Sequence, residues 1–434
     1  MAIQSLIIIL MVLVGLLAVG IPISYAIGIS SLAAILRTVP LDVSVLTAAQ
    51  RIFVGMSKFS LTAIPFFVLA GNLMNQGGIA KRLVDFVLAV LGRLPGALLV
   101  TNVGANALFG AISGSASAAA AAVGSMVQEG EEEQGYDRAL CAATNGASAP
   151  SGLLVPPSNA LITYSLVSGG TSVAALFLAG YLPGILWAAC CVLVAVIIAK
   201  KKGYRGARGN FGWKNLGTAT LRAIPALSLI VVVIGGIIAG IFTATEGSAI
   251  AVVYALILGI CYRNITLKRF WQIVVDSAKM SGMIVFLIGV SNILGWVMAF
   301  TQIPQAISEA LLGLTDSRVI ILLIMNLILL VAGTFMDVTP AILIFTPLFL
   351  PVVEAFGMST VQFGLILVYN LCIGNITPPV GNTLFVSIKV GKTSLSQVMP
   401  YMLMYYGAIL AGLLMVTYIP AVSMALPRAA GLVQ

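Results

Sequence analysis

The sequence reads GTFMDVTP at residues 333–340 and GNITPPVGN at residues 374–382, and both clusters interrupt long apolar runs. Glycine and proline break helices, and the backbone N–H and C=O groups that a break leaves unpaired are very costly to expose to lipid. Irregular backbone inside an apolar region must therefore face protein or a water-filled cavity. The two clusters thus predict a binding site within a membrane-embedded fold.

A similar arrangement occurs 222 positions earlier in the chain. Ser115 aligns with Asp337, Gly152 aligns with Gly374, and the two Pro-Pro pairs align with each other, all without a gap. The same register continues to Ser172, so chance matches of glycine, proline and serine do not explain it. We interpret it as an internal duplication in which each half carries one hairpin and one broken helix, as in duplicated secondary transporters.

The composition is that of a polytopic membrane protein. Of the 434 residues, 60% are hydrophobic and 8% are charged, the mean hydropathy is +1.11, and several apolar runs reach the roughly 18–20 residues that span a lipid bilayer. The net charge of +9 does not indicate a nucleic-acid partner, because the basic residues concentrate at helix ends and short loops. The excess of positive charge on the cytoplasmic side of membrane proteins accounts for it better.

The chain contains no histidine. This composition excludes Ser-His-Asp and Cys-His catalysis, histidine-bearing metal sites and histidine proton relays. The five cysteines lie in or beside apolar segments and show no metal-ligand spacing, so we interpret them as packing residues. The sequence therefore argues against an enzyme and predicts no cofactor.

The two predicted repeats are joined by a basic linker at residues 200–215. Between Lys200 and Lys214 it holds six basic residues and no acidic one, which places it on the cytoplasmic side. The first repeat covers residues 1–199 and the second covers residues 216–434. We expect re-entrant hairpins at about residues 95–128 and 317–355, broken helices at about residues 137–166 and 359–388, and an acidic loop at residues 129–134.

The expected fold is therefore an all-α integral membrane protein. It contains two repeats, about ten transmembrane helices and two re-entrant hairpins. Each repeat holds five spans, an odd number, so the second repeat is inverted relative to the first. The hairpins then enter from opposite sides, and their tips meet near the middle of the bilayer.

Several short motifs together carry a resemblance to a known family. They are SGSAS at residues 113–117, GYDR at 135–138, VPPS at 155–158, GIFTATE at 240–246, GTFMD at 333–337 and TPPVG at 377–381. With these motifs the chain resembles, over nearly its whole length, the large membrane subunit of tripartite ATP-independent periplasmic (TRAP) transporters. One departure is Ala244, where the family pattern leads us to expect proline, and it affects only the expected start of one helix.

The resemblance implies a multi-pass transporter of the bacterial inner membrane that couples sodium ions to the uptake of an organic acid, a carboxylate. It implies two partners, a periplasmic substrate-binding protein that delivers the acid and a small four-helix membrane subunit. It also implies an elevator mechanism, in which the hairpins and broken helices move against the remaining helices. Two other classes stay open at this stage, namely a stand-alone sodium/carboxylate symporter of related fold and a membrane enzyme or channel.

Hydroxyl groups and unwound carbonyls are suitable oxygen ligands for sodium, and half-helix N-termini present N–H groups to a carboxylate. By position, the first sodium site would consist of Ser113, Ser115 and Ser117 with carbonyls around Asn145, Gly146 and Pro150. The second would consist of Thr334, Asp337 and Thr339 with carbonyls around Gly374 and Thr377. The candidate substrate ligands, which follow the paired prolines, are Asn159 and Asn382.

Asp337 is the most specific of these candidates. An ionised carboxylate inside a membrane is costly unless it is paired, and no Lys or Arg lies within 18 residues of it. A bound cation is a natural partner, while capping of the returning hairpin helix is the alternative, and one residue can do both. For the serines and threonines the alternative is a hydroxyl bonded back to its own helix.

Overall fold

The computed structural model describes residues 2–206, 213–315 and 317–433, and its secondary structure is entirely helical in these ranges. Within these ranges six helices are long and apolar enough to cross a membrane, and one bent pair brings the number to seven. The described residues also form five shorter apolar helices of 10–17 residues, and the expected number of about ten spans is reached only if some of these are counted. The part of the predicted linker at residues 207–212 lies outside the described residues.

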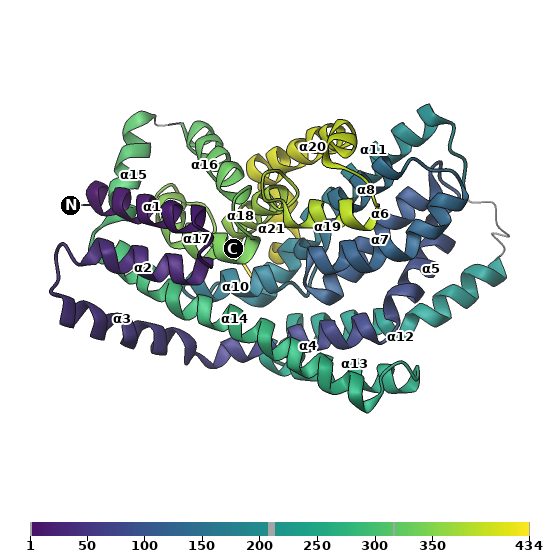
Figure 1. The fold of residues 1–434 in the computed structure, drawn as a ribbon, viewed down its shortest axis with the longest axis horizontal. Helices are drawn as coiled ribbons and strands as arrows, with labels where there is room; N and C mark the ends of the chain where they lie inside the picture. Colours follow the sequence, from purple (N-terminus) through teal and green to yellow (C-terminus); the bar gives the residue numbers. More distant parts are fainter. Residues whose placement is uncertain (1, 207–212, 316, 434) are drawn as a thin grey trace.

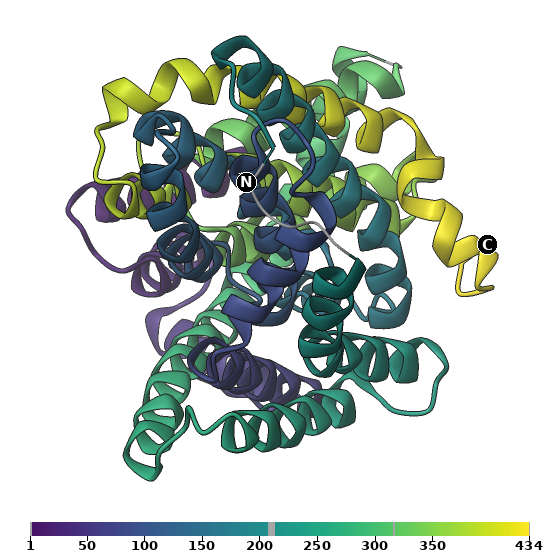
Figure 2. The same ribbon diagram turned by 90° about the vertical axis from the view of Figure 1, so that its right-hand side faces the viewer.

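Seven helices form a group that we call the outer group. They are α1 (Ala2–Ala18), α2 (Ile23–Ile35), α3 (Leu41–Met56), α4 (Ala63–Gln76), α12 (Trp213–Ile238), α13 (Ala244–Cys261) and α14 (Leu267–Phe300). The long α14 packs along α2, α3 and α4, and α13 packs against α4 (Figure 1). In Figure 2 helices α12 to α14 gather at the lower side of the molecule, opposite α20, whose yellow ribbon crosses the top.

Most other helices form a second group, the inner group. From the first half it contains the hairpin α6 (Ala97–Ser113) and α7 (Ala116–Glu133), the broken helix α8 (Arg138–Ser148), α9 (Ser151–Leu154) and α10 (Asn159–Val167), and α11 (Val173–Lys202). From the second half it contains the hairpin α16 (Arg318–Gly333) and α17 (Val338–Ala355), the broken helix α18 (Thr360–Gly374) and α19 (Asn382–Val390), α20 (Leu395–Tyr418) and α21 (Pro420–Ala429).

Two amphipathic arms connect the groups. The first, α5 (Ile79–Leu91), buries Ile79, Leu83 and Val87 along one face and packs between α12 and α6. The second, α15 (Ile303–Leu314), packs between α1 and α17. Each arm follows a helix of the outer group and leads into a hairpin of the inner group.

The hairpins turn where the sequence supplies a glycine or a capping residue. Gly114 has a φ of +64°, a conformation that favours glycine, and Ser115 then begins α7 as its N-cap, accepting from the Ala118 N–H at 3.3 Å. In the second hairpin Asp337 is the N-cap of α17 and accepts from the Val338 N–H at 2.9 Å. Asp337 therefore does act as a helix cap.

The broken helices stop at the Pro-Pro pairs, because proline has no N–H with which to continue the helical hydrogen bonds. Both Pro-Pro peptide bonds are cis. The chain becomes helical again at α10, where Ser158 accepts from the Leu161 N–H, and at α19, directly after Gly381. The break in the first half also contains α9, a single short turn of helix.

The hairpins and broken helices contact one another reciprocally. The return arm α7 packs on α19 of the second half, and the return arm α17 packs on α10 of the first half. The first arms also behave alike, since α6 packs on α8 and α9 while α16 packs on α18. The four elements are thereby interleaved, and the hairpin tips come next to the helix breaks.

Three local features differ from the sequence-based expectations. The acidic segment at residues 129–134 is not a loop, because α7 continues to Glu133 and packs on α8 and α19, with Glu131 buried and the other three glutamates exposed. Helix α8 runs past Asn145 and Gly146 to Ser148, so the break begins later than expected. A terminal helix, α21, was not expected, and it packs on α11 and α18.

Candidate functional site

Each hairpin tip lies against the break of the broken helix in the same half. In the second half the Val380 N–H donates to the Thr334 carbonyl at 3.2 Å, which joins the Pro-Pro loop to the tip. In the first half the Asn159 amide lies so close to Gly114 that a Cβ atom on this glycine would be 2.5 Å from Asn159 Nδ2. The predicted elements thus meet in space, as expected of a site built from half-helix ends.

Two pairs of glycines bring these elements into backbone contact. A Cβ atom on Gly152 would lie 2.2 Å from Gly110 Cα, and a Cβ atom on Gly374 would lie 2.4 Å from the Gly333 carbonyl carbon. Both separations are far below van der Waals contact, and the neighbouring atoms belong to the main chain. Glycine is therefore required where each broken helix crosses the first arm of its hairpin.

The three serines of the first hairpin bond to one another. Ser115 Oγ and Ser117 Oγ are 3.2 Å apart, and Ser113 Oγ donates to the Ser115 carbonyl at 3.3 Å. The serines are partly buried, and α4 of the outer group covers the tip, because a Cβ atom on Gly71 would be 2.8 Å from the Ser113 carbonyl oxygen. The tip thus gathers hydroxyl and carbonyl oxygens, which suit a small cation.

The other predicted members of the first site lie deeper in the inner group. Asn145 Nδ2 donates to the Ala120 carbonyl at 2.8 Å and to Ser387 Oγ at 3.3 Å. Gly146 faces α19, and the Pro150 carbonyl accepts from a thiol of α18. These contacts hold the broken helix against its neighbours, and none of them involves the three serines.

In the second site two hydroxyl groups are bonded back to their own helices. Thr334 Oγ1 donates to the Val331 carbonyl at 2.8 Å, and Thr377 Oγ1 donates to the Ile373 carbonyl at 2.7 Å. Donation uses the hydroxyl proton, so the oxygen of each group can still accept or ligate. Thr339 is half-buried in the first turn of α17.

Asp337 is exposed at the tip of the second hairpin, beside the exposed side chain of Phe335. Its Oδ1 accepts from the Val338 N–H, and within the described ranges no ion pair reaches its carboxylate. Asn382 is likewise exposed, in the first turn of α19. The second tip is thus open, whereas α4 covers the first.

Of the asparagines that tie the hairpins to the broken helices, only Asn145 was predicted from the sequence as a site residue. Asn106 Nδ2 donates to Asn102 Oδ1 at 2.7 Å and to Asn145 Oδ1 at 2.9 Å, and Asn370 Nδ2 donates to Asn326 Oδ1 at 3.0 Å. The Asn106–Asn145 bond and the Asn370–Asn326 bond each join the first hairpin arm to the first part of the broken helix, while the Asn106–Asn102 bond lies within α6. An asparagine within an apolar helix could have predicted these contacts, because its side-chain amide commonly forms a hydrogen bond to a neighbouring membrane helix.

Charges at the start of the first broken helix fix its position. Asp137 is the N-cap of α8, and its Oδ2 accepts from Lys202 Nζ of α11 at 2.6 Å and from the Tyr401 hydroxyl of α20 at 2.7 Å. Partial burial tends to raise the pKa of Asp137, but the bonds from Lys202, Tyr401 and the Ala139 N–H outweigh it and lower the pKa from 3.8 to about 2. Asp137 therefore stays ionised and joins three helices.

Replacing Asp137 with alanine is expected to destabilise the protein by about 1–2 kcal/mol, since a helix cap and a partly exposed ion pair are lost together. Because the folded-state pKa lies below the ordinary value, the contribution is present above pH 3.8 and is lost as the pH falls towards 2. Thermal unfolding of the purified protein measures the loss. Asp137→Asn keeps the cap and should lose only part of the stability, so equal losses in both variants would contradict this assignment.

Comparison with known proteins agrees with this architecture. A family model described as "Tripartite ATP-independent periplasmic transporter, DctM component" matches residues 10–422. The C4-dicarboxylate TRAP transporter large permease protein DctM of Rhodobacter capsulatus is 36% identical, over 99% of this chain and 100% of that protein. The isethionate TRAP transporter permease protein DctMQ of Oleidesulfovibrio alaskensis is 38% identical, over 94% of this chain and 64% of that protein.

Among solved structures, the YdaH transporter of Alcanivorax borkumensis has a similar fold. The TM-score is 0.58 at 16% sequence identity, and the match covers 83% of this chain and 86% of the transporter. At this identity the likeness concerns the fold alone.

Proposed function

The chain belongs to the DctM component family of tripartite ATP-independent periplasmic (TRAP) transporters, and from this premise we propose that it couples the entry of sodium ions to the uptake of an organic acid. As a large permease subunit it is a multi-pass protein of the inner membrane and not an enzyme. It works with a small membrane subunit and a periplasmic binding protein. We propose that the small subunit has four helices and that the binding protein delivers the acid.

The observation that carries the sodium proposal is the second hairpin tip. Among the described residues Asp337 presents a carboxylate without an ion pair, and at the same tip the Thr334 carbonyl accepts from the Val380 N–H of the Pro-Pro loop. Carboxylate, hydroxyl and carbonyl oxygens form a donor set that fits sodium. When bound, the ion would neutralise Asp337 and hold the tip and the loop together. Thr339, Gly374 and Thr377 would complete the surroundings of this site.

A first sodium site would lie at the other tip, where Ser113, Ser115 and Ser117 gather their oxygens. The carbonyls around Asn145, Gly146 and Pro150 would support it through the broken helix rather than from the tip itself. The covered first tip and the open second tip support alternating access. We propose that the inner group moves as an elevator against the outer group and exchanges these exposures.

The proposed substrate class follows from the two tips and from the relatives. Asn159 lies against the first tip, Asn382 is exposed beside the second break, and the N-termini of α10 and α19 present backbone N–H groups to an anion. The relatives named for C4-dicarboxylate and for isethionate both handle organic acids. We propose an organic acid bound between these amides, a carboxylate in the first instance.

Uptake into proteoliposomes tests the proposal. With both partner subunits and the binding protein present, we expect uptake of the acid to require an inward sodium gradient, because a tenfold gradient supplies about 1.4 kcal/mol per ion. Each net positive charge that enters gains a further 2.3 kcal/mol or so per 100 mV of membrane potential. A potassium gradient of the same size should not replace sodium.

Two controls decide between the alternatives. Uptake that is equally fast without sodium would refute the coupling. Uptake of free substrate by the isolated chain, with neither partner present, would instead identify a stand-alone symporter. Liposomes that contain only the small subunit provide the background.

A further inference from the structure

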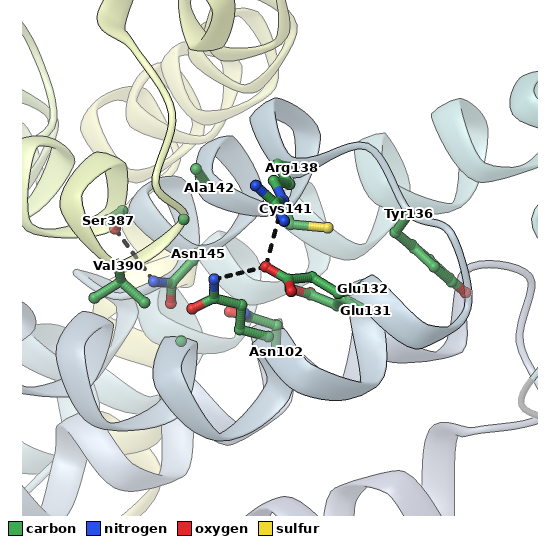
Figure 3. Close-up of a pocket in the computed structure, with 13 residues that line it drawn as sticks. Asn102, Glu131, Glu132, Tyr136, Arg138, Cys141, Ala142, Asn145, Ser387 and Val390 are labelled. Atoms are coloured by element: carbon green, nitrogen blue, oxygen red, sulfur yellow. Dashed lines mark hydrogen bonds and ion pairs between the residues drawn. The ribbon is translucent and has the colours of Figure 1, made fainter.

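A small cavity lies at the base of the first hairpin, at the opposite end of its arms from the tip. Helices α6, α7, α8 and α19 surround it, and Figure 3 shows the side chains that line it. The volume that the centre of a water molecule can occupy in this cavity is about 20 Å³. One water molecule fits into such a space, and an organic acid does not. Its chemistry is therefore separate from substrate binding.

Glu131 is buried beside this cavity, in the last turn of α7 and outside the spanning helices. Its side chain is 4% exposed, and its Oε1 has no hydrogen-bond partner among the described residues. Asn102 also lines the cavity, and its Nδ2 is buried with no hydrogen-bond partner in the described part of the chain. The Cys141 thiol hydrogen-bonds the carboxyl group. An unpartnered acceptor and an unpartnered donor thus border a space that fits one water molecule.

The charged groups around the cavity do not neutralise Glu131. Among the described residues that line it, Arg138 of α8 is the one cation, and its Nε is 3.3 Å from Glu132 Oε1 (Figure 3). Gln128 also binds Glu132, at 2.9 Å, and the adjacent Asp137 is paired with Lys202. Helix α6 contributes the neutral Asn102 and the loop contributes the neutral Tyr136. On α19, Lys389 is exposed and does not line the cavity.

The second half of the duplication shows that packing does not require these polar groups. In the register of 222 positions, Glu131 corresponds to Val353 and Cys141 corresponds to Phe363, and both counterparts are buried and apolar. A buried carboxyl group without a cation is costly, and apolar residues of similar size usually fill such positions at less cost. The carboxyl group at the base of the first hairpin therefore points to a role beyond folding.

We propose that Glu131 is a proton-binding site, protonated in the arrangement seen here and ionised when water enters the base of the first hairpin. On ionisation the carboxyl O–H bond breaks, the electron pair stays on Glu131, and the proton passes to water in the cavity. Glu131 lies 14 residues beyond Ser117, about 21 Å along α7, so this site is remote from the hairpin tip. The site connects proton binding to the packing of α7 on α8 and α19.

The electrostatics agree with this geometry. Burial raises the pKa of Glu131 from 4.5 to about 7, while the hydrogen bond from Cys141 opposes the shift and the charge of Glu132 adds to it. Between these two pH values the folded protein holds a proton that the unfolded chain has released. Stability should therefore fall as the pH rises from 4.5 to about 7 and stay level above that range.

The experiment compares the purified native chain with Glu131→Gln, which keeps the shape of the side chain and cannot ionise, over pH 5 to 8. In the native chain each pH unit inside the window should change the folding equilibrium by up to about tenfold, and Glu131→Gln should remove that slope. Glu132→Gln, next in sequence and already paired with Arg138, is the matched control and should keep the slope over a somewhat narrower pH range, because the charge of Glu132 contributes the smaller part of the shift. An equal slope in Glu131→Gln and the native chain would overturn the proposal.

A second measurement does not depend on how well Glu131→Gln folds. Infrared difference spectra of the native chain between pH 5 and pH 8 should contain a protonated-carboxyl band that disappears near pH 7 and persists in Glu132→Gln. A carboxylate that stays ionised throughout, or a thermal stability that responds to sodium or potassium at the base instead of to protons, would overturn the proposal. Neither readout requires transport, so failure here is distinguishable from failure of the proposed function. If protonation of Glu131 also makes uptake depend on pH, that consequence alone rests on the proposed transport function.

Discussion

Gly374→Ala and Gly152→Ala should each prevent formation of a stable transporter. The new Cβ atoms would lie 2.4 Å and 2.2 Å from main-chain atoms of Gly333 and Gly110, and neither helix can move without opening the site that its hairpin forms. Overpacking of this kind costs about 3 kcal/mol or more, because no side chain can rotate away. We expect a strongly lowered melting temperature in detergent and no measurable uptake in proteoliposomes.

The chain provides a matched control for this experiment. Gly407 lies in the interior of α20, and a Cβ atom there would meet nothing within 4 Å, so Gly407→Ala should be neutral or slightly stabilising. Gly333→Ala should be milder than Gly374→Ala, since its Cβ atom would be 3.2 Å from the nearest atom. If Gly374→Ala melts at the same temperature as Gly407→Ala, the close crossing of α16 and α18 is wrong.

These crossings show how far the sequence alone leads. The 222-residue register aligned Gly152 with Gly374, and the structure places both at equivalent crossings. Their partners could not be predicted in the same way, because the register pairs Gly110 with Ala332 and not with Gly333. Helix breaks follow from local chemistry, which glycine and proline disclose, whereas the partner at a crossing depends on how two distant helices pack.

The limits of prediction at the candidate site have the same origin. Asn145 and Gly146 were expected in unwound backbone, but α8 continues through them, because the Asn145 side chain bonds to α7 and α19 and not to its own backbone. The acidic run at residues 129–133 looked like a solvated loop, yet it continues α7, because Glu131 is buried against the neighbouring helices while Glu129, Glu132 and Glu133 stay exposed. In both places tertiary contacts decided the local structure, and a single sequence does not display them.

Asp337→Asn is expected to fold normally and to lose most of its uptake. Asparagine caps helices about as well as aspartate, so α17 should still begin at this position. The lost charge should weaken sodium binding by about 1.5–3 kcal/mol, the usual value of a hydrogen bond or ligand bond to a charged group, which is roughly ten- to a hundredfold in affinity. Uptake as a function of sodium concentration measures the shift, and a high sodium concentration should restore part of the rate.

Glu246→Gln is the control for the loss of one negative charge. Glu246 closes the capping box at the start of α13, where it accepts from the Thr243 N–H at 2.7 Å, and it belongs to the outer group, whereas both hairpin tips belong to the inner group. Removing its charge should leave the sodium dependence of uptake as it is in the native chain. If uptake by Asp337→Asn depends on sodium concentration in the same way as uptake by Glu246→Gln, Asp337 is a helix cap and not a sodium ligand. A selective shift in Asp337→Asn would instead place a cation at the open tip, because capping alone does not respond to sodium concentration.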